Sequence, residues 1–199
     1  MRILKNIFAL ILIVSLASCN NDDDSIDPLL DTDGDGVVDI NDLCPTTPGT
    51  VIDQGCYLFT NINVSSSPYD ITLLNSTKIQ TTNVNGLDII TETTTIGDTF
   101  QLTLTFSENG TVILDGEYRS TFVITVADQI TDEGSNIIVI DNETSNYSTN
   151  DSTMTMVLDD NVYSVTFFDK NEIRLTLETI YTENGDEFVY TENINMVRQ

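Results

Sequence analysis

The chain has 199 residues, with 32 Asp and Glu against 7 Lys and Arg, a formal charge of −25, no His and no Trp. Because phosphate binding needs a basic surface, this charge argues against a nucleic acid as a partner. Without His, catalysis by a histidine base and metal binding through imidazole are excluded. Hydrophobic residues make up 40% of the chain. That is enough for one packed core, so we expect one ordinary domain with attachments.

Residues 1–18 have the anatomy of a secretory signal peptide. Arg2 and Lys5 supply positive charge, residues 7–14 are an unbroken apolar run, and small residues follow. The segment ends in Leu-Ala-Ser-Cys at Cys19, which resembles the lipobox of bacterial lipoproteins. The resemblance implies that Cys19 is lipidated, becomes the first mature residue and anchors the chain to a membrane. The alternative is an ordinary signal peptide with a chance cysteine.

Residues 19–30 form an acidic tether that begins Cys-Asn-Asn-Asp-Asp-Asp. An acidic cluster directly after the lipid cysteine resembles the export signal of surface lipoproteins in some Gram-negative bacteria. The resemblance implies a lipid-anchored protein of the outer membrane that is exposed at the cell surface. The alternative is a solvated spacer, kept extended by the repulsion between like charges.

Residues 31–42 read DTDGDGVVDIND and match a twelve-residue calcium loop. Such a loop needs oxygen ligands at positions 1, 3 and 5, a glycine at 6, a backbone carbonyl at 7 and a carboxylate at 12. Gly36 occupies position 6, where the chain turns sharply. The predicted Ca²⁺ ligands are Asp31, Asp33, Asp35, Val37 through its carbonyl, Asp39 and Asp42. The alternative is an acidic linker that binds no ion.

The loop is followed by Cys44-Pro45 and by a Pro-Gly turn before Cys56. With the loop, these features make residues 31–56 resemble a bacterial thrombospondin type-3 repeat, which implies a small irregular calcium-binding unit. A single repeat lacks the sites shared between neighbours, so we expect one Ca²⁺. With Cys19 assigned to the lipid, Cys44 and Cys56 remain as a pair in an oxidising compartment, and we expect a disulfide. Two thiols without further Cys or His would not complete a metal site.

Residues 57–199 predict an all-β antiparallel meander of about ten strands, the first over residues 58–64 and the last over residues 188–197. Thr, Val and Ile alternate with polar residues, and turn signals recur. The clearest strand covers residues 99–106, and Asn109-Gly110 after it is typical of a hairpin turn. The side chains expected to point inward include Phe100, Leu102, Leu104, Phe106, Met154, Met156, Leu158, Tyr163, Val165, Phe167, Ile173, Leu175, Leu177, Tyr181, Phe188, Tyr190, Ile194 and Met196.

One apolar face per strand predicts a single interior, as in a barrel or, alternatively, a β-sandwich. The segment FSENGT at residues 106–111 and the terminal segment NINMV at residues 193–197 resemble lipocalin-like domains of bacterial lipoproteins. The resemblance implies a lipocalin-like barrel over residues 57–199. Its expected partner is an apolar small molecule, or a surface protein or glycan.

The catalytic patterns that we sought do not stand out in the sequence. There is no Gly-x-Ser-x-Gly elbow, and the paired acids Asp159 and Asp160 lie at an expected turn, where solvated acids are ordinary. We therefore expect a surface lipoprotein, not an enzyme, that holds calcium in a stalk and presents a barrel to a small ligand or partner. The alternative is a structural or adhesive surface protein with a solid core. A hollow interior favours the ligand-binding hypothesis, and a filled interior with an exposed apolar patch favours the structural or adhesive one.

Overall fold

The computed structural model describes residues 29–51 and 53–199. The predicted signal peptide, the predicted lipidation site Cys19 and the tether up to residue 28 lie outside the described residues. The chain comprises two compact units, and the boundary between them falls between Gly55 and Cys56. Within the described residues, no helix is long and apolar enough to cross a membrane.

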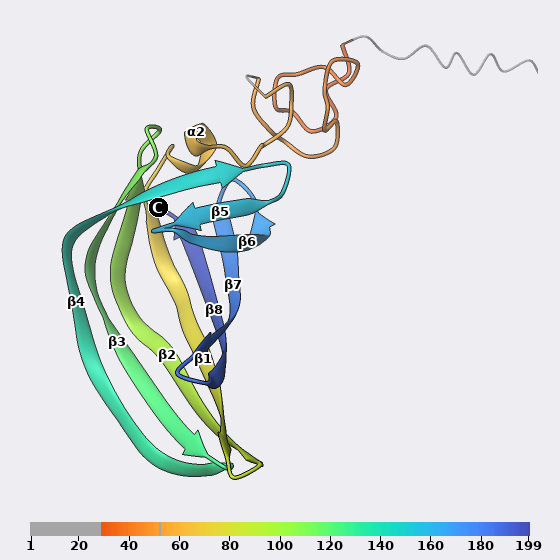
Figure 1. The fold of residues 1–199 in the computed structure, drawn as a ribbon. Coiled ribbons are helices and arrows are strands. Elements are labelled where there is room, and N and C mark those ends of the chain that lie inside the picture. The colour runs from red at the N-terminus through yellow and green to blue at the C-terminus, as the bar shows by residue number, and fades with distance from the viewer. Residues whose placement is uncertain (1–28, 52) are drawn as a thin grey trace, which may run out of the picture. The chain divides into compact units, whose positions relative to one another are not determined.

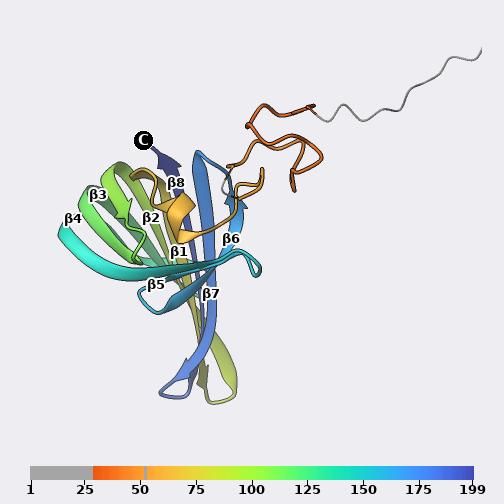
Figure 2. The same ribbon diagram turned by 90° about the horizontal axis from the view of Figure 1, so that it is seen from above.

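The second unit is a closed barrel of antiparallel strands in which each strand pairs with the next and β8 pairs back with β1 (Figures 1 and 2). This confirms the all-β meander and selects the barrel over the sandwich. The strands are β1 (Tyr69–Val84), β2 (Leu87–Phe106), β3 (Thr111–Val126), β4 (Gln129–Asn150), β5 (Thr155–Leu158), β6 (Asn161–Phe168), β7 (Glu172–Glu183) and β8 (Asp186–Arg198).

The expectation of about ten strands is wrong, because several short segments merge into long strands that bend instead of ending. β2 runs through a register shift between Asp98 and Gln101, and β3 passes through Gly116. Gly116 has a φ of +127°, and a Cβ there would lie 1.9 Å from the Gln101 carbonyl oxygen. Glycine thus lets β3 approach β2 closely at a bend, and the strand continues through it.

The strand expected over residues 58–64 is also wrong, because this segment contains the short helix α2 (Asn61–Val64). The Thr60 side chain caps the helix by accepting a hydrogen bond from the Asn63 backbone N–H at 3.3 Å. The Asn63 amide in turn donates to the Leu58 carbonyl at 2.8 Å. These local bonds favour a helical turn over a strand.

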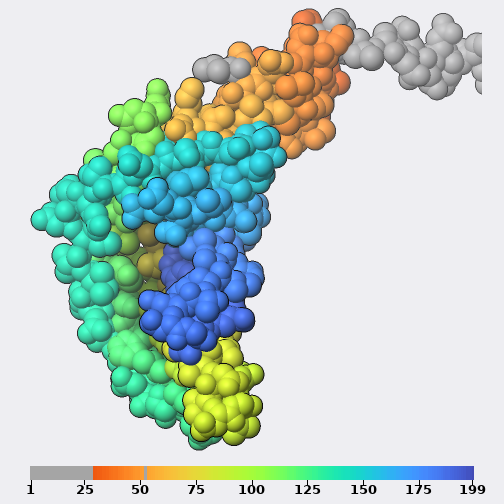
Figure 3. All heavy atoms as spheres, in the orientation of Figure 1, coloured from red at the N-terminus to blue at the C-terminus, as the bar shows by residue number. Residues whose placement is uncertain are grey.

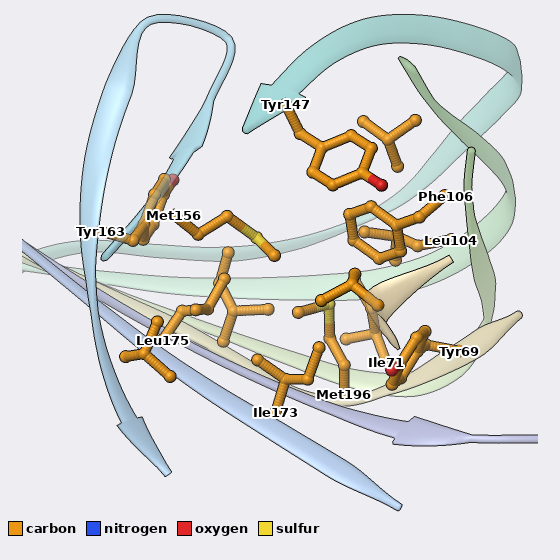
Figure 4. Packing of buried hydrophobic residues seen from close by; sticks show 14 of the residues in the cluster. Tyr69, Ile71, Leu104, Phe106, Tyr147, Met156, Tyr163, Ile173, Leu175 and Met196 are labelled. Atoms are coloured by element: carbon orange, nitrogen blue, oxygen red, sulfur yellow. The ribbon is translucent and has the colours of Figure 1, made fainter. Parts of the chain in front are cut away.

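A packed core, part of which Figure 4 shows, lies within the barrel and includes Val64 of α2. Tyr69, Phe106 and Tyr147 meet edge to face, with ring centroids 5.7 and 4.8 Å apart. Met156 and Met196 are fully buried within the same cluster. The remaining buried members include Phe59, Val64, Ile71, Leu102, Leu104, Val112, Tyr163, Val165, Ile173, Leu175, Leu177 and Ile194. Most side chains that the sequence assigns to the interior therefore lie in it.

Three of the inward assignments fail. A register shift between Val165 and Phe167 leaves Phe167 40% exposed, and Phe168 packs against the core instead. Met154 precedes β5 in a turn with a φ of +47° and is 37% exposed. Tyr181, also 37% exposed, lies near the end of β7 and stacks on Phe188. Side chains alternate between the two faces only where strands pair regularly, so a bulge can reverse their direction and a strand end can leave them exposed.

Arg198, the last residue of β8, ties the segment before β1 to the barrel. Its guanidinium donates to the Asn63 carbonyl at 2.7 Å and to the Tyr69 hydroxyl. It also lies over the rings of Tyr57 and Tyr69, 5.8 and 5.1 Å from their centroids. Such cation–π contacts strengthen when the cation is shielded from water, as this half-buried guanidinium is.

Candidate ligand cavity and calcium loop

The barrel is not solid throughout, because a cavity of about 390 Å³ lies beside the packed core. Its apolar wall comes from strands on several sides of the ring. The wall includes Ile71 and Leu74 of β1, Leu102 and Leu104 of β2, Leu114 of β3, Ile140 of β4 and Met196 of β8. The inward side chains of these strands thus line a space as well as contributing to the packed core.

The lengths of the strands explain why the barrel wall is incomplete at one side. β5 pairs with only the last part of β4, residues 147–150, and β6 pairs with only the first part of β7, residues 173–176. The rest of β4 and β7 therefore lacks a strand between them. Figure 3 shows this face hollowed between β4 and the β7–β8 hairpin.

A carboxylate lies inside the barrel at this level. Glu192 of β8 accepts a hydrogen bond on Oε1 from the Tyr163 hydroxyl at 2.6 Å and one on Oε2 from the Tyr190 hydroxyl at 2.5 Å. Glu192 also borders two further described spaces, of about 410 and 220 Å³. These two spaces and the cavity of about 390 Å³ thus share one half-buried acid.

The tyrosines around Glu192 are held in their neutral, hydrogen-bond-donating form. Burial and the neighbouring Glu192 raise the pKa of Tyr190 to about 12, and the same two causes raise the pKa of Tyr163. Burial, with a smaller effect of Glu192, also raises the pKa of Tyr118. These hydroxyls keep their protons at neutral pH, and those of Tyr163 and Tyr190 orient the Glu192 carboxylate by donating to it.

The charged groups around the cavity have one sign. The charged residues of its described lining are Glu143, Asp159 and Glu192, all acidic, of which Glu192 is half-buried and the other two are exposed. Lys78 borders the neighbouring space of about 410 Å³ instead, with its ammonium 4.6 Å from the centroid of the Phe188 ring. The cavity therefore joins an apolar wall to a negative potential.

Glu192 and Lys78 are not among the site residues predicted from the sequence, although the alternation contains the signal. Glu192 lies between the inward residues Tyr190 and Ile194 of β8, two positions from each. Lys78 pairs directly with Tyr190 across the β1–β8 ladder and so shares its face. A charged residue at an inward position of an alternating strand is the sequence pattern that predicts both.

The predicted calcium loop lies in the first unit and brings three of its acids together. Carboxylate oxygens of Asp31, Asp33 and Asp35 lie within 4.8 Å of one another. These three residues are half-buried, and the residues that follow each of them are exposed. Asp31 also accepts hydrogen bonds from the backbone N–H of Gly34 at 2.8 Å and of Gly36 at 3.0 Å. Every second side chain thus turns inward, as the loop spacing requires.

The donor set of this loop suits a hard cation. One oxygen of Asp33 and one of Asp42 are buried without a hydrogen-bond partner. Burial, together with the charges of nearby Asp35, Asp42 and Asp31, raises the pKa of Asp33. Ca²⁺ binds carboxylate oxygens and reduces the repulsion between them, so oxygens without a hydrogen-bond donor in this loop are suited to bind it.

The structure gives a different surrounding to Asp39. Its carboxylate accepts hydrogen bonds from the backbone N–H and the hydroxyl of Thr32, at 2.8 and 2.6 Å. Asp39 is not a member of the group formed by Asp31, Asp33 and Asp35. The roles of all six residues as Ca²⁺ ligands stay predictions: Asp31, Asp33, Asp35, Val37, Asp39 and Asp42.

Cys44 and Cys56 are joined by a disulfide, the pair that remains when Cys19 is set aside. Near it, the Leu43 N–H donates to the Gln54 carbonyl at 2.9 Å. The bond closes a short loop, and such a link stabilises a small irregular unit chiefly by restricting its unfolded state.

No protein-family model matches the chain, and no curated protein matches it. Among solved structures, it is similar to the crystal structure of Ail, the attachment invasion locus protein of Yersinia pestis. The two are 7% identical, with a TM-score of 0.21, and the match covers 67% of this chain and 99% of that one. The barrel assignment rests on the strand pairing itself. The lipocalin-like and thrombospondin type-3 resemblances stay predictions.

Proposed function

We propose that this protein is an exported, lipid-anchored surface protein whose barrel binds an apolar small molecule in its interior. The observation that carries the proposal is the cavity of about 390 Å³ with its apolar wall. Ligand pockets commonly hold about 300–1,000 Å³, and an apolar cavity of about 150 Å³ is enough for benzene. Eight-stranded barrels of this size hold one small ligand in other proteins. The alternative, a structural or adhesive protein, needs a solid core, and the cavity counts against it.

The proposed cellular location depends on the sequence of the first residues. The signal-like segment and Cys19 support lipid anchoring, and the acidic run after Cys19 supports display at the cell surface. In this proposal the calcium unit stiffens the stalk between the lipid and the barrel. Asp31, Asp33 and Asp35 would bind the ion, and its positive charge would reduce the repulsion between their carboxylates.

Ligand binding is tested with a neutral apolar fluorophore, N-phenyl-1-naphthylamine, added to the mature chain carrying Cys19→Ser. We expect saturable enhancement of its fluorescence. Leu114→Trp should abolish the enhancement by filling the cavity, whereas Ile137→Trp, at a side chain 61% exposed on the neighbouring strand, should leave it unchanged. Circular dichroism shows whether each variant is folded. Equal enhancement in the two folded variants would overturn the proposal.

The calcium unit is tested separately by calorimetric titration of the same mature chain. We expect uptake of one Ca²⁺ at up to millimolar concentration, the range of extracellular modules. The double variant Asp33→Ala, Asp35→Ala should lose it, and Asp141→Ala, an exposed acid of the barrel, should bind as the parent does. Calcium uptake that is unchanged in the double variant would refute the site.

A further inference from the structure

We infer that the barrel cavity selects its ligand by charge and binds an amphiphile with an ammonium head, anchored on Glu192. This inference rests on the proposed function, because it specifies the ligand class of the same cavity. Its basis is the juxtaposition of an apolar wall with an oriented interior carboxylate.

The Glu192 carboxylate has acceptor capacity left after its two tyrosine contacts. An ionised carboxylate offers about four lone-pair positions. Tyr163 and Tyr190 occupy one on each oxygen. In the described part of the chain, the ion pairs are Arg119–Asp98 and Arg174–Glu172, so Glu192 belongs to neither. An ammonium group donates three hydrogen bonds and carries the missing charge.

The remaining charges of the cavity point to the same ligand. Glu143 and Asp159 also line it, and basic residues are absent from its described lining. A ligand with a carboxylate head would meet repulsion chiefly from the half-buried Glu192, because Glu143 and Asp159 are exposed and water screens their charges. The low dielectric constant beside an apolar wall strengthens the repulsion from Glu192. The cavity is therefore unsuited to a fatty acid, although its wall suits a fatty tail.

Ser145 supplies an independent observation at the same cavity. Its hydroxyl oxygen is buried and has no hydrogen-bond partner in the described structure. Ser145 lines the cavity from β4, opposite Val112 of β3. A buried hydroxyl without a partner is costly, and a polar group of a bound ligand would relieve the cost.

Among the described spaces around Glu192, a basic side chain that could bind an anionic head borders the neighbouring one, and it is Lys78. It borders the neighbouring space and already contacts the Phe188 ring. On β1 it pairs with Tyr190, whereas Ser76 pairs with Glu192. An anion bound at Lys78 would leave the apolar wall of the cavity of about 390 Å³ unused.

The test compares three amphiphiles with the same twelve-carbon tail: dodecylamine, dodecanol and dodecanoate. Each displaces N-phenyl-1-naphthylamine from the mature chain at pH 7, below its micelle concentration. We expect dodecylamine to bind roughly tenfold or more tightly than dodecanoate, with dodecanol between them. This order is measured on the parent protein and does not depend on whether any variant folds.

Variants then locate the selectivity. Glu192→Gln keeps the size of the side chain and should weaken dodecylamine roughly tenfold while leaving dodecanol nearly unchanged. Glu187→Gln is the matched control: it removes the same charge from an exposed position of the same strand and should change neither. Lys78→Met should also leave dodecylamine binding intact.

The outcomes separate this inference from the proposed function. Dodecanoate binding as tightly as dodecylamine, or equal effects of Glu192→Gln and Glu187→Gln, would overturn the inference. Binding of dodecanoate that is lost in Lys78→Met would do the same and would assign the ligand to the neighbouring space. The proposed function would survive these results as long as Leu114→Trp abolishes probe binding. If none of the three amphiphiles displaces the probe and Leu114→Trp leaves probe binding unchanged, both the inference and the proposed function would be refuted.

Discussion

Replacing Leu175 by Ala should lower the free energy of unfolding by about 2–5 kcal/mol. Leu175 is 1% exposed, pairs with Val165 of β6 and Ile194 of β8, and lies in the core that Figure 4 shows. The substitution removes the equivalent of three buried carbon groups, at about 0.8 kcal/mol each for transfer alone. The cavity left behind adds to this cost, because the barrel strands around it cannot collapse fully.

The assay is equilibrium unfolding in urea, followed by circular dichroism and by tyrosine fluorescence, since the chain has no Trp. The slope of the transition should stay constant while its midpoint falls. Leu87→Ala makes the same chemical change at a side chain that is 73% exposed and should cost under about 0.5 kcal/mol. A loss below half a kilocalorie for Leu175→Ala, or equal losses for both variants, would refute the assigned register of β7.

Three further predictions concern pH, the barrel end and the lipid. Burial raises the pKa of Tyr147 from 10.0 to about 12. As the pH rises, the unfolded chain therefore loses this proton before the folded chain does, and the free energy of unfolding should fall between pH 10 and 12. The urea midpoint of Tyr147→Phe should fall less over this range than that of the parent protein, and an equal fall would contradict the prediction. Arg198→Met should lower the unfolding free energy by about 1.5–3 kcal/mol, because a charged hydrogen bond to the Asn63 carbonyl is lost, and an unchanged urea midpoint would count against it. Cys19→Ser should end the incorporation of labelled fatty acid in cells, and a labelled variant would disprove lipidation.

The core strands and the tight turns were predictable because both are local. In a regular strand successive side chains point to opposite faces, so the alternation alone places Leu102 and Leu175 inside. The turn at Asn184 and Gly185 depends on positive φ values, 53° and 92°, which these two residue types tolerate. Neither feature depends on which strand lies next to which.

Strand length and bulges could not be predicted in this way. Gly116 lies at a bend inside β3 instead of at a strand end, because pairing with β2 continues on both sides of it. Phe167 points away from the interior because the β6–β7 ladder slips by one residue before it. Both outcomes are properties of a pair of strands, and neither strand contains them alone.

The same division holds for the candidate sites. The spacing of the acids in residues 31–42 predicts a cation loop by itself, because its ligands are close in sequence and its turn is local. The inward position of Glu192 likewise follows from alternation along β8. The cavity that Glu192 faces was decided only by tertiary structure, because β5 and β6 are too short to complete the wall. Whether an interior is filled depends on side chains from eight strands together, and no one strand carries that information.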